Sequence, residues 1–209
     1  MPELDLNYRG PMKWLFVFVA LLAPVTASGQ DEPVKVPEEV NVFVKKGTAP
    51  IALESGDLNG DGRKDLILVV SETIPDGERY EEGAGDRTVM VLIREAGGSL
   101  TLAARNDLVA YCRNCGGVYG DPFAGVTVRG TRFTVSNYGG SNSRWSFSST
   151  FAYSRRDRTW QLVRVEEESF HALDPRRTMR RRVYTPPNDF GLITFADFDP
   201  DTFRRKGKK

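Results

Sequence analysis

The sequence predicts a mainly β (α+β) protein in which antiparallel hairpins form two units of roughly four strands, arranged like two propeller blades or like a sandwich, with one short N-terminal helix. Short apolar runs rich in β-branched residues, such as 66–70 and 88–93, indicate buried strands. Apolar and polar residues alternate in 145–153, as expected for a strand with one buried face. Glycine-rich turns such as 96–98 separate these runs, so neighbouring strands are expected to pair as hairpins.

A short helix is predicted for 38–47. A proline precedes this stretch, acidic residues fill its first turn, lysines its last, and a glycine ends it. Val40, Phe43 and Val44 then line one face of the helix. The alternating valines of 40–44 also allow a strand, and we prefer the helix.

The strands fall into two groups along the chain. The first unit is expected to contain 51–53, 65–70, 88–93 and 99–103, with the acid-rich stretch 71–87 as an exposed loop. The second unit is expected to contain 124–128, 132–135, 145–153 and 159–165.

The charged stretch 166–182 is interpreted as a solvated linker or helix. Its arginine cluster has a second interpretation, as a patch that faces anionic envelope material. Two last strands are predicted at 183–184 and 190–195.

The most informative stretch lies between two predicted strands. Its oxygen atoms occupy positions 1, 3, 5, 7 and 9 of a calcium loop, contributed by Asp57, Asn59, Asp61, Arg63 (backbone carbonyl) and Asp65. Gly62 at position 6 permits the sharp turn that such a loop needs. An EF-hand requires a glutamate at position 12, where Leu68 stands within an apolar strand. The sequence therefore predicts a structural Ca²⁺ site between two strands, and a metal-free turn is the alternative.

This stretch resembles a known repeat. A strand, the motif Gly-Asp-x-Asn-Gly-Asp-Gly-x-x-Asp-Leu and a second apolar strand, from 51 to 70, are similar to the FG-GAP/VCBS repeat of integrin-like propellers. The nearest second copy, Asp197-Phe-Asp-Pro-Asp201, has Thr202 in place of the glycine. It is expected to be an acidic turn, and a weak second metal site is the alternative. A closed propeller needs several blades, so a full integrin-like propeller is excluded.

A longer resemblance extends from about 37 to 166. The segments Ala104-Arg-Asn-Asp, Cys112-x-x-Cys-Gly-Gly-Val-x-Gly-Asp-Pro-Phe123, Tyr138-Gly-Gly-Ser and Arg144-Trp145 resemble a group of small exported bacterial proteins. Those proteins carry one calcium-type repeat followed by a Cys-Gly-Gly segment and hairpins. The resemblance implies a fold and export, and it implies no activity.

The N-terminus has the pattern of a targeting segment. Lys13 precedes ten apolar residues, whereas a bilayer span needs about twenty. Small residues at a Val-x-Ala or Ala-x-Gly cleavage pattern follow, which predicts a signal peptide at 1–29, with Met12 as an alternative start. A leader at 30–36, a single β-rich domain at 37–203 and a basic tail at 204–209 complete the predicted organisation. The expected location is the periplasm or the extracellular space, without stable membrane insertion after cleavage.

Cys112 and Cys115 allow three interpretations. A redox pair should open a helix whose dipole lowers the thiol pKa, and the glycines at 116 and 117 argue against that helix. A zinc site needs four ligands, and the two cysteines with the single His171 supply fewer. A structural disulfide suits an oxidising compartment and is the preferred interpretation.

Composition and motifs favour a binding role. The chain has 29 Lys and Arg against 28 Asp and Glu, so no charge excess indicates a nucleic-acid partner. His171 lies far from any serine or cysteine nucleophile signature, and no catalytic site is evident. We therefore predict an exported, calcium-stabilised β-rich module that binds an envelope or extracellular protein or glycan. The alternatives are an envelope hydrolase with an unrecognised carboxylate site and a thiol-disulfide protein that uses Cys112 and Cys115.

The expected partner surface follows the strand that ends near 135. Polar and aromatic residues of the kinds found in glycan or peptide contact surfaces are Asn137, Tyr138, Ser141, Asn142, Arg144 and Trp145. An ordinary long hairpin loop is the alternative interpretation of this stretch.

Overall fold

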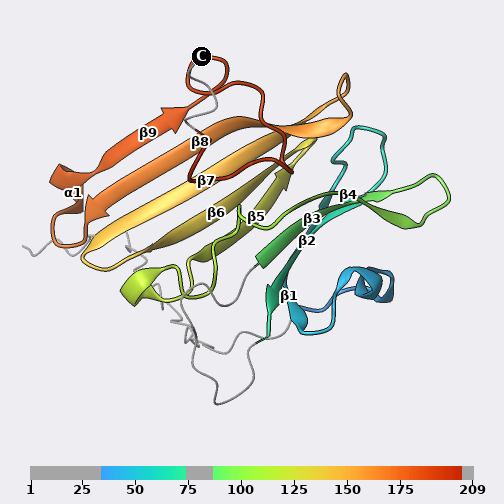
Figure 1. Ribbon diagram of the computed structural model, residues 1–209, viewed down its shortest axis with the longest axis horizontal. Helices are drawn as coiled ribbons and strands as arrows, with labels where there is room; N and C mark the ends of the chain where they lie inside the picture. The colour runs from blue at the N-terminus through green and yellow to red at the C-terminus, as the bar shows by residue number, and fades with distance from the viewer. Residues whose placement is uncertain (1–33, 74–86, 204–209) are drawn as a thin grey trace, which may run out of the picture. The chain divides into compact units, whose positions relative to one another are not determined.

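The computed structural model describes residues 34–73 and 87–203, which form two antiparallel sheets (Figure 1). The predicted mainly β fold with hairpins in sequence order is confirmed. The signal peptide at 1–29, most of the leader at 30–36, the tip of the acidic loop and the basic tail at 204–209 lie outside the described residues.

The first sheet contains the strands expected around the calcium-type loop. In order they are β1 (Thr48–Gly56), β2 (Asp65–Glu72), β3 (Arg87–Arg94) and β4 (Leu100–Asn106). β2 is apolar over nearly its whole length because both of its faces are covered. Ile67 and Val69 pack into the larger hydrophobic core, whereas Leu66, Leu68 and Val70 pack into a smaller one on the opposite face.

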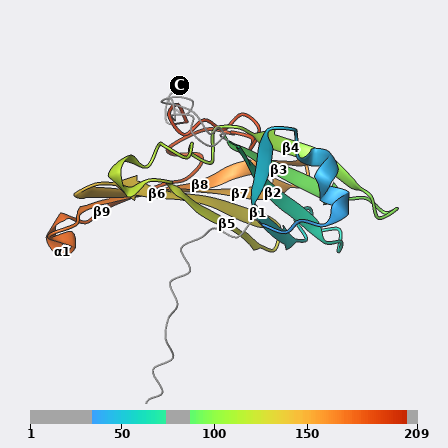
Figure 2. The ribbon, with the colours of Figure 1, turned by 90° about the horizontal axis from the view of Figure 1, so that it is seen from below.

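The smaller core explains the short N-terminal helix. It is a 3₁₀ helix, η1 (Glu38–Phe43), rather than the longer α-helix that the sequence pattern suggests. Val40 is fully buried, and Phe43 and Val44 pack against the same cluster, as the helical spacing predicts. Figure 2 shows η1 on the side of the first sheet that faces away from the second sheet.

The second sheet has five strands instead of the expected four. They are β5 (Phe123–Arg129), β6 (Arg132–Gly140), β7 (Ser143–Ser154), β8 (Thr159–His171) and β9 (Arg180–Tyr184). A two-residue turn joins β5 to β6 at Gly130, as predicted. The long loop expected between β6 and β7 is instead a two-residue turn, Ser141 and Asn142, because β6 continues to Gly140.

The prediction of a solvated linker at 166–182 is wrong. β8 continues to His171, the one-turn helix α1 (Pro175–Thr178) follows, and β9 returns beside β8. Acidic residues of β8 face basic residues of β9 across the ladder, and Arg181 contacts Glu166 at 3.1 Å and Glu168 at 3.3 Å. Opposite charges therefore stabilise a strand pair that lacks the usual apolar pattern.

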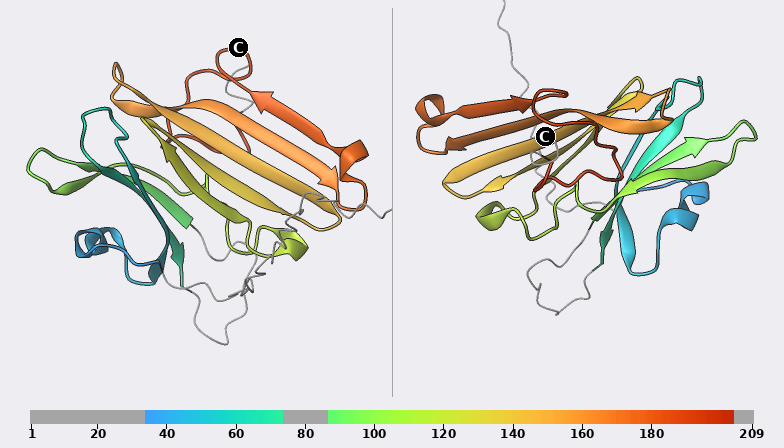
Figure 3. Two further views of the ribbon diagram at one scale, coloured as in Figure 1. Left: turned by 180° about the vertical axis from the view of Figure 1, so that it is seen from behind. Right: turned by 45° about the horizontal axis from the view of Figure 1, so that its top comes forward.

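The C-terminal segment is also different from its prediction. Residues 190–195 form no regular strand, and the contact of this stretch with β8 is a single bridge between Gln161 and Thr194. The segment runs across the second sheet (Figure 3) and inserts buried side chains into the larger core, namely Phe190, Ile193, Phe195, Phe198 and Phe203. The larger core therefore joins three parts, which are the two sheets and the C-terminal segment.

Candidate functional site

The calcium-type loop joins β1 to β2 and turns at two glycines. Gly60 and Gly62 have φ angles of 77° and 84°, which side chains rarely tolerate. One carboxylate oxygen of Asp57 accepts the amide protons of Gly60 and Asp61 at 2.7 and 3.0 Å, and the other accepts that of Gly62 at 3.0 Å. The Asp57 carboxylate thus points into the loop and organises its backbone.

Asn59 and Asp61 form a second set of contacts. The Asn59 side-chain amide donates to the Asp61 carboxylate at 2.7 Å, and the Arg63 guanidinium forms an ion pair with the same carboxylate. Burial raises the pKa of Asp61, but the hydrogen bonds from the Arg63 amide and the Asn59 side chain and the charge of Arg63 outweigh it. The net result is a pKa below the usual value, so the carboxylate is ionised at neutral pH.

Asp65 lies at the first position of β2 and is fully buried. One carboxylate oxygen accepts the Leu58 amide proton at 2.8 Å, and the other accepts the Arg94 amide proton at 2.9 Å. Burial raises the pKa of Asp65 above its usual value, and these two hydrogen bonds oppose the rise. Asp65 therefore fastens the loop to the end of β3.

The loop also contacts the second sheet. Leu58 is fully buried in the larger core, and its carbonyl accepts the indole proton of Trp160 in β8 at 3.1 Å. At the end of β1, a Cβ on Gly56 would lie 2.6 Å from a methyl carbon of Val128 in β5. The loop is thus held where the two sheets meet.

The chemistry of this loop fits a hard cation, since every expected ligand presents oxygen. In the structure, the side-chain oxygens of these expected ligands already accept hydrogen bonds from the protein. Among residues 34–73 and 87–203, no three His, Cys, Asp or Glu side chains are placed to hold one metal ion. A calcium ion bound by Asp57, Asn59, Asp61, the Arg63 carbonyl and Asp65 would compete with Arg63 for Asp61 and share Asp65 with two backbone amides.

Cys112 and Cys115 form a disulfide, as the preferred interpretation expects. Cys112 is 9% exposed, whereas Cys115 lies at the surface. The cysteines are followed by η2 (Gly117–Tyr119), a three-residue 3₁₀ turn, so the helix that would lower a thiol pKa does not start at this disulfide.

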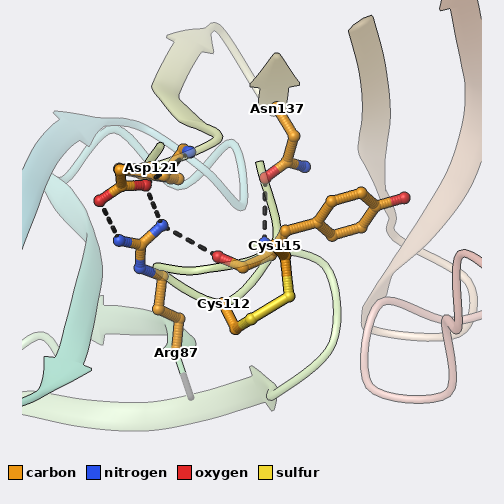
Figure 4. Close-up of a disulfide and its surroundings, with 7 residues drawn as sticks. Arg87, Cys112, Cys115, Asp121 and Asn137 are labelled. Atoms are coloured by element: carbon orange, nitrogen blue, oxygen red, sulfur yellow. Dashed lines mark hydrogen bonds and ion pairs between the residues drawn. A yellow bond between two sulfur atoms is a disulfide. The ribbon is translucent and has the colours of Figure 1, made fainter. Parts of the chain in front are cut away.

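Hydrogen bonds anchor the disulfide segment to both sheets (Figure 4). Arg87 of β3 is 2% exposed and forms a two-pronged ion pair with Asp121, while it also donates to the Tyr111 carbonyl at 2.9 Å. The Tyr111 amide donates to the Asn137 side chain of β6 at 3.0 Å. These contacts place the segment beside the end of β6, where the Gly140 amide donates to the Gly116 carbonyl.

The six residues expected to form one partner surface are divided among four environments. Asn137 is 1% exposed, and its side-chain amide donates to the Val109 carbonyl at 3.0 Å, so it is an internal residue. Ser141 and Asn142 form the exposed turn. The physical reason is that β6 and β7 continue through this stretch, and successive side chains of a strand point to opposite faces.

The two faces separate the remaining three residues. The Arg144 guanidinium lies 4.8 Å above the Tyr119 ring, and that ring meets Tyr138 edge to face at 4.9 Å. Trp145 lies on the opposite face of β7, where it contacts the Tyr111 ring at 5.6 Å. Two smaller aromatic clusters thus replace the single surface that the sequence suggested.

A pocket of about 300 Å³ beside Trp145 includes residues that sequence analysis did not select as site residues. Besides Trp145, the lining residues are Ser146, Glu167, Glu168, Ser169, Arg180 and Arg182. The signal in the sequence is a run of acids followed, after a short break, by a run of arginines of similar length. Two charged runs of opposite sign predict a pair of strands only if the residues between them are identified as a turn.

No family model matches this chain, and neither a curated protein nor a solved structure matches it. Among residues 34–73 and 87–203, no helix is long and apolar enough to span a membrane.

Proposed function

We propose that this protein is an exported binding module whose fold is stabilised by one calcium ion. The observation that supports the proposal most strongly is the loop at 57–65, where oxygen-bearing side chains at calcium-loop spacing surround a backbone that turns at two glycines. The resemblance of this stretch to an FG-GAP/VCBS repeat supports the same proposal.

The ion would act on stability because of where the loop lies. Leu58 is inserted into the larger core, and Asp65 holds the amides of Leu58 and Arg94. Calcium binds in this way only if the carboxylates around it are ionised, and the raised pKa of Asp65 shows that burial makes its charge costly. A cation beside Asp65 would compensate that charge and hold the loop against both sheets.

The binding role is supported by the surfaces and not by the loop. Aromatic rings lie on both faces of β7, beside Arg144 on one face and at Trp145 on the other, and one buried Arg144 nitrogen has no hydrogen-bond partner among the described residues. We propose an envelope or extracellular partner, either a protein or a glycan, in keeping with the predicted signal peptide and the disulfide. A nucleic-acid partner is not proposed, because the net charge of the chain is +1.

Calorimetric titration of calcium into the chelator-treated full chain tests the ion directly. We expect one site with a dissociation constant of about 10⁻⁴–10⁻³ M, as in extracellular modules. The double variant Asp57→Ala/Asp61→Ala should lose this binding, whereas Asp199→Ala in the acidic turn near the C-terminus should retain it. Equal binding by all three proteins would place the ion elsewhere, and no binding by the wild type would refute the calcium proposal.

A further inference from the structure

The inner face of the second sheet continues beyond the hydrophobic core. In an antiparallel ladder, residues directly opposite each other point to the same face, and so does every second residue. One row across β7, β8 and β9 is Ser149, Val165 and Tyr184, which belongs to the core region. The next two rows on this face are Phe147, Glu167 and Arg182, and then Trp145, Ser169 and Arg180.

Five residues of these two outer rows line the pocket of about 300 Å³, together with Ser146 and Glu168. Its volume is at the small end of ligand sites. Its apolar wall is Trp145, whose ring lies against Gly139. A Cβ on Gly139 would come within 2.6 Å of the indole, so glycine leaves room for the ring at this position. Ser169 is short and separates the indole from Arg180, which keeps the space between them open.

The charges on the two faces of β9 differ. On the outer face, Arg181 forms ion pairs with Glu166 and Glu168. On the pocket face, neither Arg180 nor Arg182 forms an ion pair with any carboxylate in the described part of the chain. Glu167 accepts the Tyr184 hydroxyl proton at 3.1 Å and is therefore engaged at the edge of the pocket. Glu168 also lines the pocket, and its carboxylate forms an ion pair with Arg181. The pocket face itself therefore carries two arginines and Glu167.

We propose that this pocket binds a sugar acid, such as a hexuronate residue of an acidic glycan. A guanidinium pairs with a carboxylate through two parallel hydrogen bonds, and Arg182 and Arg180 both offer that geometry. The flat carbon face of the sugar ring packs on Trp145, and its hydroxyl groups reach Ser169 and Glu167. Glu167 disfavours ligands with several phosphates, because each additional negative charge would be repelled there.

This inference rests on the proposed binding role and narrows it to one ligand class and one place. It does not depend on the calcium loop, because every residue of the pocket lies in β7, β8 or β9. A failure of this inference can therefore be distinguished from a failure of the calcium proposal by titrating calcium into the same sample.

Calorimetric titration of trigalacturonate into the full-length protein is the test, with its fully methyl-esterified form as the uncharged ligand. We expect the acid to bind and the ester to bind at least tenfold more weakly, since hydrogen bonds to charged groups contribute about 1.5–3 kcal/mol, or roughly tenfold to a hundredfold in affinity.

The matched variants are Arg182→Gln and Arg181→Gln, which remove the same charge from opposite faces of one strand. Arg182→Gln should weaken trigalacturonate binding about tenfold or more, and Arg181→Gln should change it less than about threefold. Trp145→Leu should also weaken the binding of trigalacturonate. Circular dichroism checks that this variant is folded. Equal effects of the two arginine variants, equal affinity for acid and ester, or no binding of the acid at millimolar concentration would overturn the inference.

Discussion

Asp65 joins the loop at 57–65 to the end of β3 through its buried carboxylate. Its spacing from Asp57 and Gly62 predicts that it is the ninth position of a calcium loop. The structure adds that the carboxylate is buried and that each of its oxygens accepts one backbone amide proton. Spacing could not reveal this second role, because the Arg94 amide comes from a strand 29 residues away.

Asp65→Asn should therefore destabilise the protein even without calcium. An asparagine has one acceptor oxygen, so it would leave either the Leu58 or the Arg94 amide facing an NH₂ group. We expect a loss of about 1–3 kcal/mol in the free energy of unfolding, measured by urea denaturation in the presence of a chelator. Glu54→Gln, at an exposed position of β1, is the control and should change stability by less than about 0.5 kcal/mol. A stability loss no larger than that of the control would contradict the structural role of Asp65.

Asn137 shows the limit of composition-based surface prediction at the residue scale. A stretch rich in Asn, Gly, Ser and aromatic residues is typical of contact surfaces. Here the Asn137 side-chain amide donates to the Val109 carbonyl, and its oxygen accepts the Tyr111 amide proton. These two hydrogen bonds hold the chain just before the disulfide. A polar residue can serve internal backbone groups as readily as a partner, and the sequence does not distinguish these uses.

At the scale of elements, the pairing of β8 with β9 is the main feature that the sequence did not predict. The expected strands were found from apolar alternation, and β9 has almost none because its residues are exposed. In the pairing of β8 with β9, charge complementarity takes the place of apolar alternation. On the outer face, burial raises the pKa of Glu166, but hydrogen bonds from Arg164 and Arg181 and their charges outweigh it and lower the pKa below the usual value.

The direction of that shift makes a pH-dependent prediction for Glu166→Gln. A carboxyl whose pKa is lower in the folded state stabilises the protein above its unfolded pKa of about 4.3, and this contribution is lost as the pH falls through the folded pKa. The variant should be about 0.5–1 kcal/mol less stable than the wild type at neutral pH, a value expected for a partly exposed ion pair.

Urea denaturation at several pH values checks this prediction. The stability difference should shrink as the pH falls below about 4.3 and should vanish once Glu166 is protonated in the folded state as well. A difference that stays constant between neutral pH and about pH 3 would show that Glu166 acts through packing and not through its charge.

At the scale of the whole molecule, the sequence predicted which segments pair but not what fills the space between the sheets. Hairpins are local, so turn residues and alternation determined most of β1 to β8. The C-terminal phenylalanines follow no regular period, and their burial depends on contacts with distant strands. Phe195 lies within 5.1 Å of both Phe133 and Phe151 between ring centroids, and the Asn106 side chain donates to the carbonyls of Phe195 and Phe198. Such contacts exist only once both sheets have formed.

The calcium-type loop connects this large-scale arrangement to the proposed function. The loop inserts Leu58 into the shared core, and Trp160 of β8 donates to its carbonyl. Fixing the loop with an ion should therefore stabilise the assembly of both sheets as one cooperative unit. This coupling is the central claim, and it predicts that calcium affects global unfolding and not only the loop.

Thermal unfolding of the full chain with calcium and with chelator tests that claim most directly. At about 1 mM calcium and a dissociation constant of about 0.1 mM, linkage adds about 1.4 kcal/mol to the stability of the folded state. For a protein of this size we expect a rise of about 3–6 °C in Tm for the wild type and none for Asp57→Ala/Asp61→Ala. The same Tm with calcium and with chelator in a folded wild type would contradict the account, and the loop at 57–65 would then be a turn held by its own hydrogen bonds.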